Sequence, residues 1–223
     1  MRLLKTVALA GVAIAAINLS SANAAGLWVS YTGHDAFQYR WGTQERTTSA
    51  LNFNAWLSPT DDDTKNGTDL GSVYCVDLRG RVPHNPSEYE VIPRSDETNW
   101  ADPSGRENFN KVSWLLNNFG REAATRGERN GLQVAIWECA YASRFTYIGG
   151  LEADAEAAYM TYKNAAQGHR GAPSTSFRWF DADARTGGGQ DMGQPVPEPG
   201  TMLLMGAGLV GAGLISRRRR RQS

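Results

Sequence analysis

The sequence predicts an α+β domain, built as an antiparallel β-sandwich or barrel-like sheet with a helical subdomain of two to three helices. Apolar alternation typical of strands fills residues 25–93. Apolar side chains at helical spacing fill residues 104–167, and one more strand-like segment follows at 176–180. Strands that precede the helices, rather than alternate with them, favour the α+β class over a doubly wound parallel sheet.

The first half of the chain contains several short segments that are rich in aromatic and β-branched residues. Turn-forming residues separate these segments, and the separator at residues 61–71 is acidic and contains glycine. The predicted strands are residues 27–31, 37–41, 51–57, 73–78 and 89–92. These segments form the sheet of the predicted domain.

The first predicted helix begins where Ser104 and Glu107 match a capping box. Gly120 supplies the stop signal. Between these two points the apolar side chains recur at helical spacing, at Phe109, Val112, Leu115, Leu116 and Phe119. This spacing predicts one helix with an apolar face.

Two more helices are predicted after residues 121–129, a charged segment that we expect to be exposed. Asn130 is expected to cap the second helix, which ends near residue 142. An alanine-rich third helix fits residues 151–167. Residues 184–196 are rich in Gly and Gln and are expected to form a linker. The globular domain is therefore expected to span residues 25–183.

The N-terminus has the three parts of a signal peptide. Arg2 and Lys5 form a basic start, residues 6–19 are mostly apolar, and residues 22–24 form a small-x-small cleavage site. We expect residues 1–24 to be removed between Ala24 and Ala25. The mature protein is then exported.

The C-terminus carries a second targeting pattern. Pro197, Glu198 and Pro199 precede an apolar run at residues 201–216, and five arginines follow at residues 217–221. This pattern resembles the PEP-CTERM sorting tail of Gram-negative bacteria. The resemblance implies a transmembrane helix that anchors the chain transiently in the inner membrane, cleavage by an exosortase, and delivery to the cell surface or to the extracellular matrix of a biofilm.

The exported part is acidic, although the formal net charge of the whole chain is zero. Residues 25–198 hold 16 basic and 23 acidic residues, a net charge of −7. An acidic domain repels nucleic acid and anionic membranes. We therefore expect no nucleic-acid partner, and membrane contact only through the C-terminal tail.

Two segments carry the chemistry of the domain. One reads Tyr74-Cys75-Val76-Asp77, and the other contains Gln133 and Trp137 in a Gln-x-Ala-Ile-Trp pattern. Together they resemble the Cys–Gln thioester domain of bacterial surface adhesins. The resemblance implies that the Cys75 sulfur condenses with the Gln133 carboxamide and releases ammonia. It implies covalent adhesion to a target amine or hydroxyl, on a protein or an exopolysaccharide, in a single event that is not enzyme turnover.

The spacing also predicts the surroundings of this bond. Gln133, Trp137 and Tyr141 share one face of the predicted helix, so Trp137 and Tyr141 are expected to shield the bond from water. On the strand, Asp77 lies on the same side as Cys75 and is expected to orient the reacting groups, while Tyr74 lies on the other side. Because Asn130 is the expected cap, Gln133 falls in the first helical turn, where free backbone N–H groups can stabilise an oxyanion.

Alternative interpretations of the same residues stay open. Gln133 fits a capping box with Asn130, and Trp137 fits an ordinary core. Cys75 and Cys139 fit a disulfide, which predicts a passive structural matrix protein. Cys75 with His84 fits a thiol hydrolase.

No metal or other cofactor is expected. Asp61, Asp62, Asp63, Asn66 and Asp69 suggest calcium, but the twelfth position counted from Asp62 is Val73 rather than glutamate. We therefore expect an acidic, solvated loop. The three histidines, His34, His84 and His169, show no metal-ligand spacing.

Overall fold

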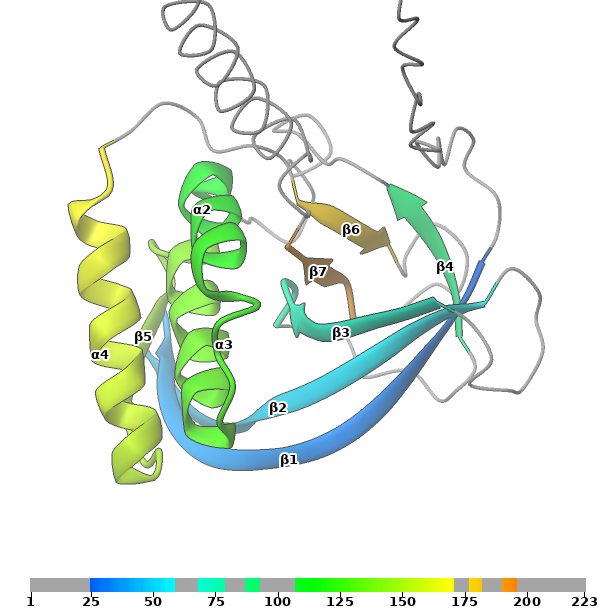
Figure 1. The fold of residues 1–223 in the computed structure, drawn as a ribbon. Helices are drawn as coiled ribbons and strands as arrows, with labels where there is room; N and C mark the ends of the chain where they lie inside the picture. The colour runs from blue at the N-terminus through cyan, green and yellow to red at the C-terminus, as the bar shows by residue number, and fades with distance from the viewer. Residues whose placement is uncertain are drawn as a thin grey trace, which may run out of the picture.

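The computed structural model describes residues 25–58, 68–78, 87–92, 107–170, 177–181 and 190–195 (Figure 1). The signal peptide, the Pro197–Pro199 motif and the apolar tail lie outside these residues. Within them the chain forms seven strands and three helices. Every strand pair is antiparallel, and the predicted α+β class is confirmed.

A long hairpin forms the base of the sheet. Strand β1 (Ala25–Trp41) pairs with β2 (Gln44–Ser58) along nearly its whole length, and both strands curve strongly (Figure 1). The sequence predicted two strands where β1 is a single one. A register shift between Tyr31 and Gly33 lets the strand bend there without ending.

Five shorter strands complete the sheet, which has the order β2-β3-β7-β6-β4-β1-β5. They are β3 (Thr68–Cys75), β4 (Ser87–Ile92), β5 (Phe145–Gly149), β6 (Arg178–Asp181) and β7 (Met192–Gln194). The strands belong to one curved sheet, not to the two stacked sheets of a sandwich. Neither β5 nor β7 was predicted from the sequence.

Strand β7 changes the expected domain boundary. It lies inside residues 184–196, the segment expected to be a linker. Instead, residues 190–195 are buried, and β7 pairs with both β3 and β6. Residues 190–195 are therefore part of the folded domain, and β7 holds β3, the strand that carries Cys75.

The three helices lie side by side on one side of the sheet (Figure 1). They are α2 (Phe109–Phe119), α3 (Arg126–Ala140) and α4 (Ala153–Gly168). Helix α4 and the end of α2 match the prediction closely. Helix α2 begins later than predicted, at Phe109 after the N-cap Asn108, and Glu107 lies outside the helix. Helix α3 approaches α4 closely at Gly131, where an added Cβ would lie 2.5 Å from the backbone nitrogen of Tyr159.

Helix α3 begins earlier than predicted. Thr125 caps it, because the Thr125 hydroxyl accepts a hydrogen bond from the Glu128 N–H and the Glu128 carboxylate accepts one from the Thr125 N–H. Asn130 is therefore an internal residue of the helix, and it is fully buried. Both predictions that made Asn130 the cap are wrong.

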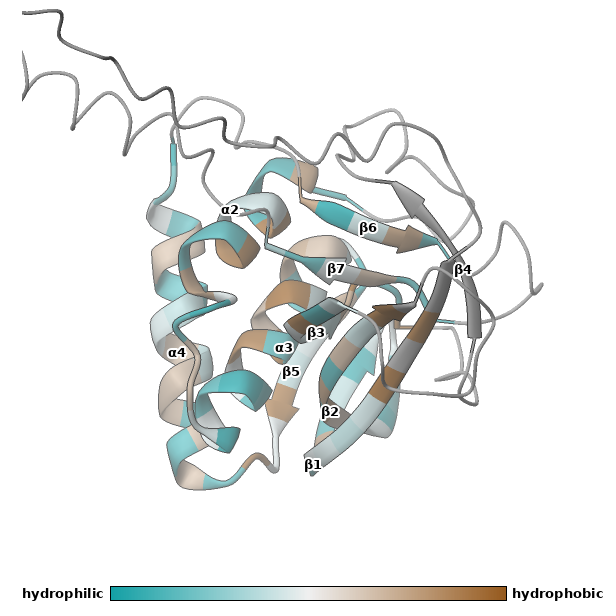
Figure 2. Cartoon of the chain, turned by 45° about the vertical axis from the view of Figure 1, so that its right-hand side comes forward, coloured by the Kyte–Doolittle hydropathy of each residue, from teal (hydrophilic) through white to brown (hydrophobic). Residues whose placement is uncertain are grey.

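The core lies between the curved sheet and α3. Every residue from Gly131 to Trp137 is buried, so α3 is a central helix rather than a surface one. Figure 2 shows hydrophobic residues on α3 and along β1 and β2, while α4 is mostly pale or teal. Buried aromatic side chains, among them Phe37, Phe145 and Trp137, fill the space between the two layers.

Candidate functional site

Cys75 is the last residue of β3 and is 1 % exposed. It pairs with Met192 of β7, and the next residue, Val76, donates its N–H to the Asp191 carbonyl at 2.9 Å. The chain segment that contains β7 thus holds the backbone of Cys75 and of the residue after it.

The Gln133 side chain, from the middle of α3, binds the backbone of Cys75 at two points. Its Nε2 donates to the Cys75 carbonyl oxygen at 2.7 Å, and its Oε1 accepts from the Cys75 N–H at 2.8 Å. Gln133 is fully buried. The fold therefore brings together two residues that are 58 positions apart, and it presents the carboxamide to the residue whose thiol it would acylate.

The source of any oxyanion stabilisation differs from the prediction. Helix α3 starts at Arg126, so Gln133 lies about two turns inside it and far from the free N–H groups of the helix start. The donor to the Gln133 carbonyl oxygen is instead the backbone N–H of Cys75. Nothing in the local sequence pattern indicates this contact, because it depends on how β3 packs against α3.

Asp77, two residues after β3, and Tyr141, the C-cap of α3, form a second contact nearby. The Tyr141 hydroxyl donates to Asp77 Oδ1 at 2.9 Å and accepts from the Leu78 N–H at 3.4 Å. Both side chains are buried, and the Gln190 amide donates to the Asp77 carbonyl. Tyr74 lies on the other side of the strand, where its hydroxyl donates to the Gly120 carbonyl at 3.0 Å. Tyr74 is therefore not part of this contact.

Trp137 lies one turn after Gln133 on α3 and packs against the sheet. Its ring stacks on Phe37 of β1, with ring centroids 6.1 Å apart, and it is 2 % exposed. The indole Nε1 has no hydrogen-bond partner, nor has either polar atom of the Asn130 side chain. Asn130, Gln133 and Trp137 follow helical spacing along one face of α3. Unpartnered buried polar atoms are uncommon, and here they share the face that carries Gln133.

Burial governs the electrostatics of the Cys75 thiol. Desolvation raises its pKa well above the ordinary value, and the nearby charge of Asp77 raises this pKa further. The thiol is therefore protonated at neutral pH. Any reaction of this sulfur has to move the proton as the new bond forms.

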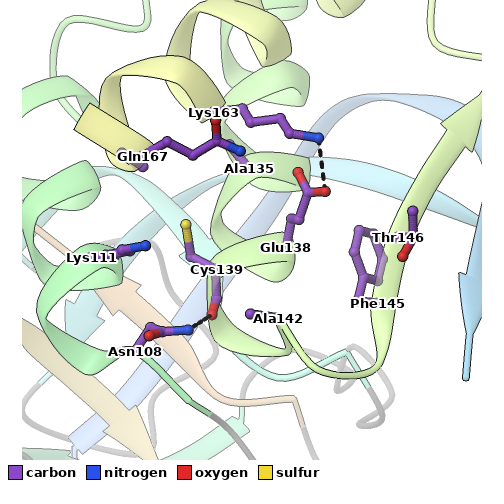
Figure 3. Close-up of a pocket in the computed structure, with 11 residues that line it drawn as sticks. Asn108, Lys111, Ala135, Glu138, Cys139, Ala142, Phe145, Thr146, Lys163 and Gln167 are labelled. Carbon is purple, nitrogen blue, oxygen red and sulfur yellow. Dashed lines mark hydrogen bonds and ion pairs between the residues drawn. The ribbon is translucent and has the colours of Figure 1, made fainter. Parts of the chain in front are cut away.

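Cys139 lies in different surroundings, beside a cavity of about 230 Å³ among the three helices and β5. Figure 3 shows its sulfur turned toward the same space as Lys111 and Gln167. Glu138, next to it, binds Lys163 Nζ at 3.0 Å. Burial raises the pKa of the Cys139 thiol to about 11, and the charge of Lys111 partly opposes this shift.

Both cysteines are free thiols in the structure. The disulfide that the passive-matrix interpretation invoked is therefore not present. Cys139 lies six positions after Gln133 on α3 and faces the cavity instead of β3. At 100° per residue, six positions place Cys139 on a different face of α3 from Gln133.

The candidate metal ligands that the structure describes do not gather into a metal site. Across the described part of the chain, no three His, Cys, Asp or Glu side chains lie together in a way that could hold an ion. His169 stacks on Trp114, and the Asp69 carboxylate accepts from the Gly71 N–H at 2.8 Å. The remaining acidic residues of the calcium hypothesis, and His84, lie outside the described residues.

None of the helices described here is both long and apolar enough to cross a membrane. The predicted membrane helix at residues 201–216 is not among them.

Comparison with known proteins identifies the C-terminal segment. Residues 195–221 match the model of the PEP-CTERM protein-sorting motif. Searches of curated proteins and of solved structures give no significant match. The match supports the sorting tail predicted at residues 197–221. The chain therefore carries a PEP-CTERM sorting motif, which marks it as an exported, surface-sorted protein and a substrate for an exosortase.

Proposed function

We propose that this exported protein forms an internal thioester between Cys75 and Gln133 and uses it to attach covalently to a nucleophile on a target at the cell surface or in the extracellular matrix. The observation that supports this proposal best is the pair of hydrogen bonds between the Gln133 carboxamide and the Cys75 backbone. A carboxamide is a poor acyl donor and needs enforced proximity to the thiol, and these two bonds hold it against the residue that carries the thiol.

The first step is condensation. The Cys75 sulfur attacks the side-chain carbonyl carbon of Gln133, a C–S bond forms, and the C–N bond breaks. The thiol proton leaves with the nitrogen as ammonia. Negative charge develops on Gln133 Oε1, which already accepts a hydrogen bond from the Cys75 N–H at 2.8 Å. A donor aimed at this atom before the reaction stabilises the transition state.

Burial of the site has two opposite effects on this chemistry. The raised pKa of Cys75 disfavours a free thiolate, so the proton has to move during the attack. The carboxylate of Asp77, whose charge acts on the thiol, is our candidate for assisting this proton transfer. Once the thioester has formed, the same burial keeps water away from it.

The second step is transfer to the target. A hydroxyl or amine attacks the Gln133 carbonyl carbon, the C–S bond breaks, and the sulfur takes up the proton of the nucleophile. An ester or amide to Gln133 remains, and Cys75 is again a thiol. The protein reacts once, so it acts as a covalent adhesin rather than as an enzyme. The target hydroxyl or amine belongs to a protein or an exopolysaccharide.

A passive structural role is the second candidate, and one observation favours it. The Gln133 carboxamide and the Cys75 backbone already satisfy each other's hydrogen bonds, without any reaction. Such a contact also serves simply to pin β3 to α3 in the core. In that case Gln133 keeps its nitrogen permanently.

Intact mass spectrometry of the freshly purified mature domain separates the two candidates. The thioester makes the domain lighter by one ammonia, and methylamine then adds its full mass and frees the Cys75 thiol. Cys75→Ala and Gln133→Ala abolish both effects, whereas Cys139→Ala, the matched control, retains them. A domain that keeps its full mass and ignores methylamine has the passive role.

A further inference from the structure

An open hollow of about 440 Å³ lies at the tip of the β1–β2 hairpin. The described residues that line it are Tyr39, Trp41, Arg46 and Leu78. Tyr39 and Trp41 point to the same face of β1, and Arg46 is the direct cross-strand partner of Tyr39. The hairpin turns at Gly42, whose φ of +61° favours glycine. The Gly42 N–H donates to the Arg144 carbonyl at 2.7 Å, which fixes the tip against the turn after α3.

This hollow adjoins the two elements that carry Cys75 and Gln133. The Trp41 ring meets the Tyr141 ring edge-on, with centroids 5.1 Å apart, and the Tyr141 hydroxyl binds Asp77 and Leu78. Cys75 and Gln133 are themselves buried, so a target cannot reach them directly from solvent. Trp41 and Leu78 both contact the buried Tyr141 and are themselves partly exposed. These two residues therefore connect the surface to the buried Tyr141.

The chemistry of the lining selects the ligand. Trp41 is partly exposed, and an indole ring presents a flat, apolar face that suits the C–H face of a sugar ring. Tyr39 is buried, with its ring stacked on Phe145. Arg46 donates to the neutral Gln44 amide at 2.8 Å, and no carboxylate among the described residues pairs with it. Its guanidinium is always charged and binds carboxylates well. It also repels the ammonium of a lysine side chain.

We propose that this hollow binds an acidic saccharide, and that a hydroxyl of the bound saccharide is the acceptor for the Gln133 acyl group. The binding part of the inference is independent of the thioester, whereas the acceptor part rests on the proposed function. In the transfer, a C–O bond forms at the Gln133 carbonyl carbon and the C–S bond breaks. The hydroxyl proton passes to the Cys75 sulfur. The Asp77–Tyr141 pair connects Trp41, at the hollow, to the segment that carries Cys75.

The binding part is tested with the Cys75→Ala mature domain, which cannot form a thioester. A short oligogalacturonate is titrated by calorimetry, with a neutral maltooligosaccharide and a lysine-rich peptide as alternatives. We expect the oligogalacturonate to bind, and Arg46→Gln to weaken the binding about tenfold through loss of a charge-assisted contact.

Arg40→Gln is the matched control for this experiment. Arg40 is an exposed arginine of the same hairpin that pairs with Glu45 and does not line the hollow. It should leave the affinity unchanged. Equal losses in the two variants, no binding of oligogalacturonate, or preferred binding of the neutral sugar or the peptide would overturn the proposal.

The acceptor part is tested with the domain that retains Cys75. Incubation with the oligogalacturonate should give an adduct that survives denaturation and is released by hydroxylamine, as an ester is. Arg46→Gln should keep the loss of ammonia and the reaction with methylamine, yet form about tenfold less adduct. If the domain keeps its ammonia, the thioester proposal fails while the titration still decides on the hollow. If the thioester is present and Arg46→Gln forms as much adduct, the hollow is not the acceptor site.

Discussion

Cys75 is buried at the end of β3, with the Gln133 carboxamide bound to its backbone, whereas Cys139 borders a cavity beside Lys111. The pKa of the Cys75 thiol is raised beyond that of Cys139, which is about 11, because Cys75 is more fully desolvated and lies near Asp77. The thiol with the less favourable ionisation is thus the one whose backbone binds a carboxamide, the acyl donor of the proposed thioester. The difference teaches that proximity to a partner, and not intrinsic nucleophilicity, distinguishes the two sites.

The largest expected effect comes from removing the partner of Cys75. Compared with Cys75→Ala, in which Gln133 keeps its nitrogen, Gln133→Ala leaves two buried backbone groups of residue 75 without hydrogen bonds and should lower the free energy of unfolding by about 3 kcal/mol. Cys139→Ala should cost about 1 kcal/mol, a typical value for one substitution. Denaturant unfolding followed by circular dichroism measures both.

A control separates the hydrogen bonds from the thioester in this measurement. Gln133 binds only backbone atoms of residue 75, so Cys75→Ala keeps both hydrogen bonds while it removes the sulfur. Gln133→Ala should therefore be less stable than Cys75→Ala. Equal stability of these two variants would show that the hydrogen bonds contribute little.

The next prediction compares Tyr141, which binds Asp77 on the Cys75 side, with Tyr159, which binds Glu138 on the Cys139 side. Tyr141→Phe removes the hydrogen bond to Asp77 and should cost about 2 kcal/mol, because the acceptor is charged. It should also slow the loss of ammonia. Tyr159→Phe removes a hydrogen bond of 2.6 Å to Glu138, on the Cys139 side, and should leave the loss of ammonia unchanged. Time-resolved intact mass measures this loss, and an equal rate in the two variants would argue against a role for Tyr141.

A smaller effect concerns the pH dependence of Cys139. Its pKa of about 11 means that the thiolate fraction rises tenfold for each pH unit between 7 and 10. Alkylation of the native domain by iodoacetamide should follow this slope at Cys139 and should not label Cys75. Labelling at Cys75 in the native domain, or a plateau near pH 9, would contradict the burial of the two thiols.

The smallest expected effect concerns the charge of Lys111 beside Cys139. The charge of Lys111 favours the Cys139 thiolate, so Lys111→Gln should raise the pKa of Cys139 and slow its alkylation about threefold at pH 8. The variant should not change the loss of ammonia at Gln133. A change there would mean that the two cysteine sites are coupled.

Local sequence patterns predicted the parts of the fold that local interactions determine. The strand-to-helix order, α2 and α4 follow from periodicity, and the Cys75–Gln133 contact agrees with the resemblance of the two segments. The start of α3 was missed because two capping patterns compete, Thr125 with Glu128 and Asn130 with Gln133. Close packing of Gly131 against α4 buries Asn130 and excludes the second pattern.

Strand β7 and the contacts that hold the Cys75 backbone could not be predicted from local sequence patterns. Residues 192–194 are short and partly polar, and they form a strand only because β3 and β6 lie on either side of them. The two hydrogen bonds of Gln133 likewise join segments 58 positions apart. Such contacts depend on tertiary packing, which single-segment patterns do not encode.

Peptide mapping of the freshly purified mature domain tests the central claim most directly. After proteolysis at acidic pH, the account predicts one cross-linked species that joins the peptide containing Cys75 to the peptide containing Gln133 and lacks one ammonia. Recovery of the two peptides separately, with a free thiol on one and an intact carboxamide on the other, would contradict it.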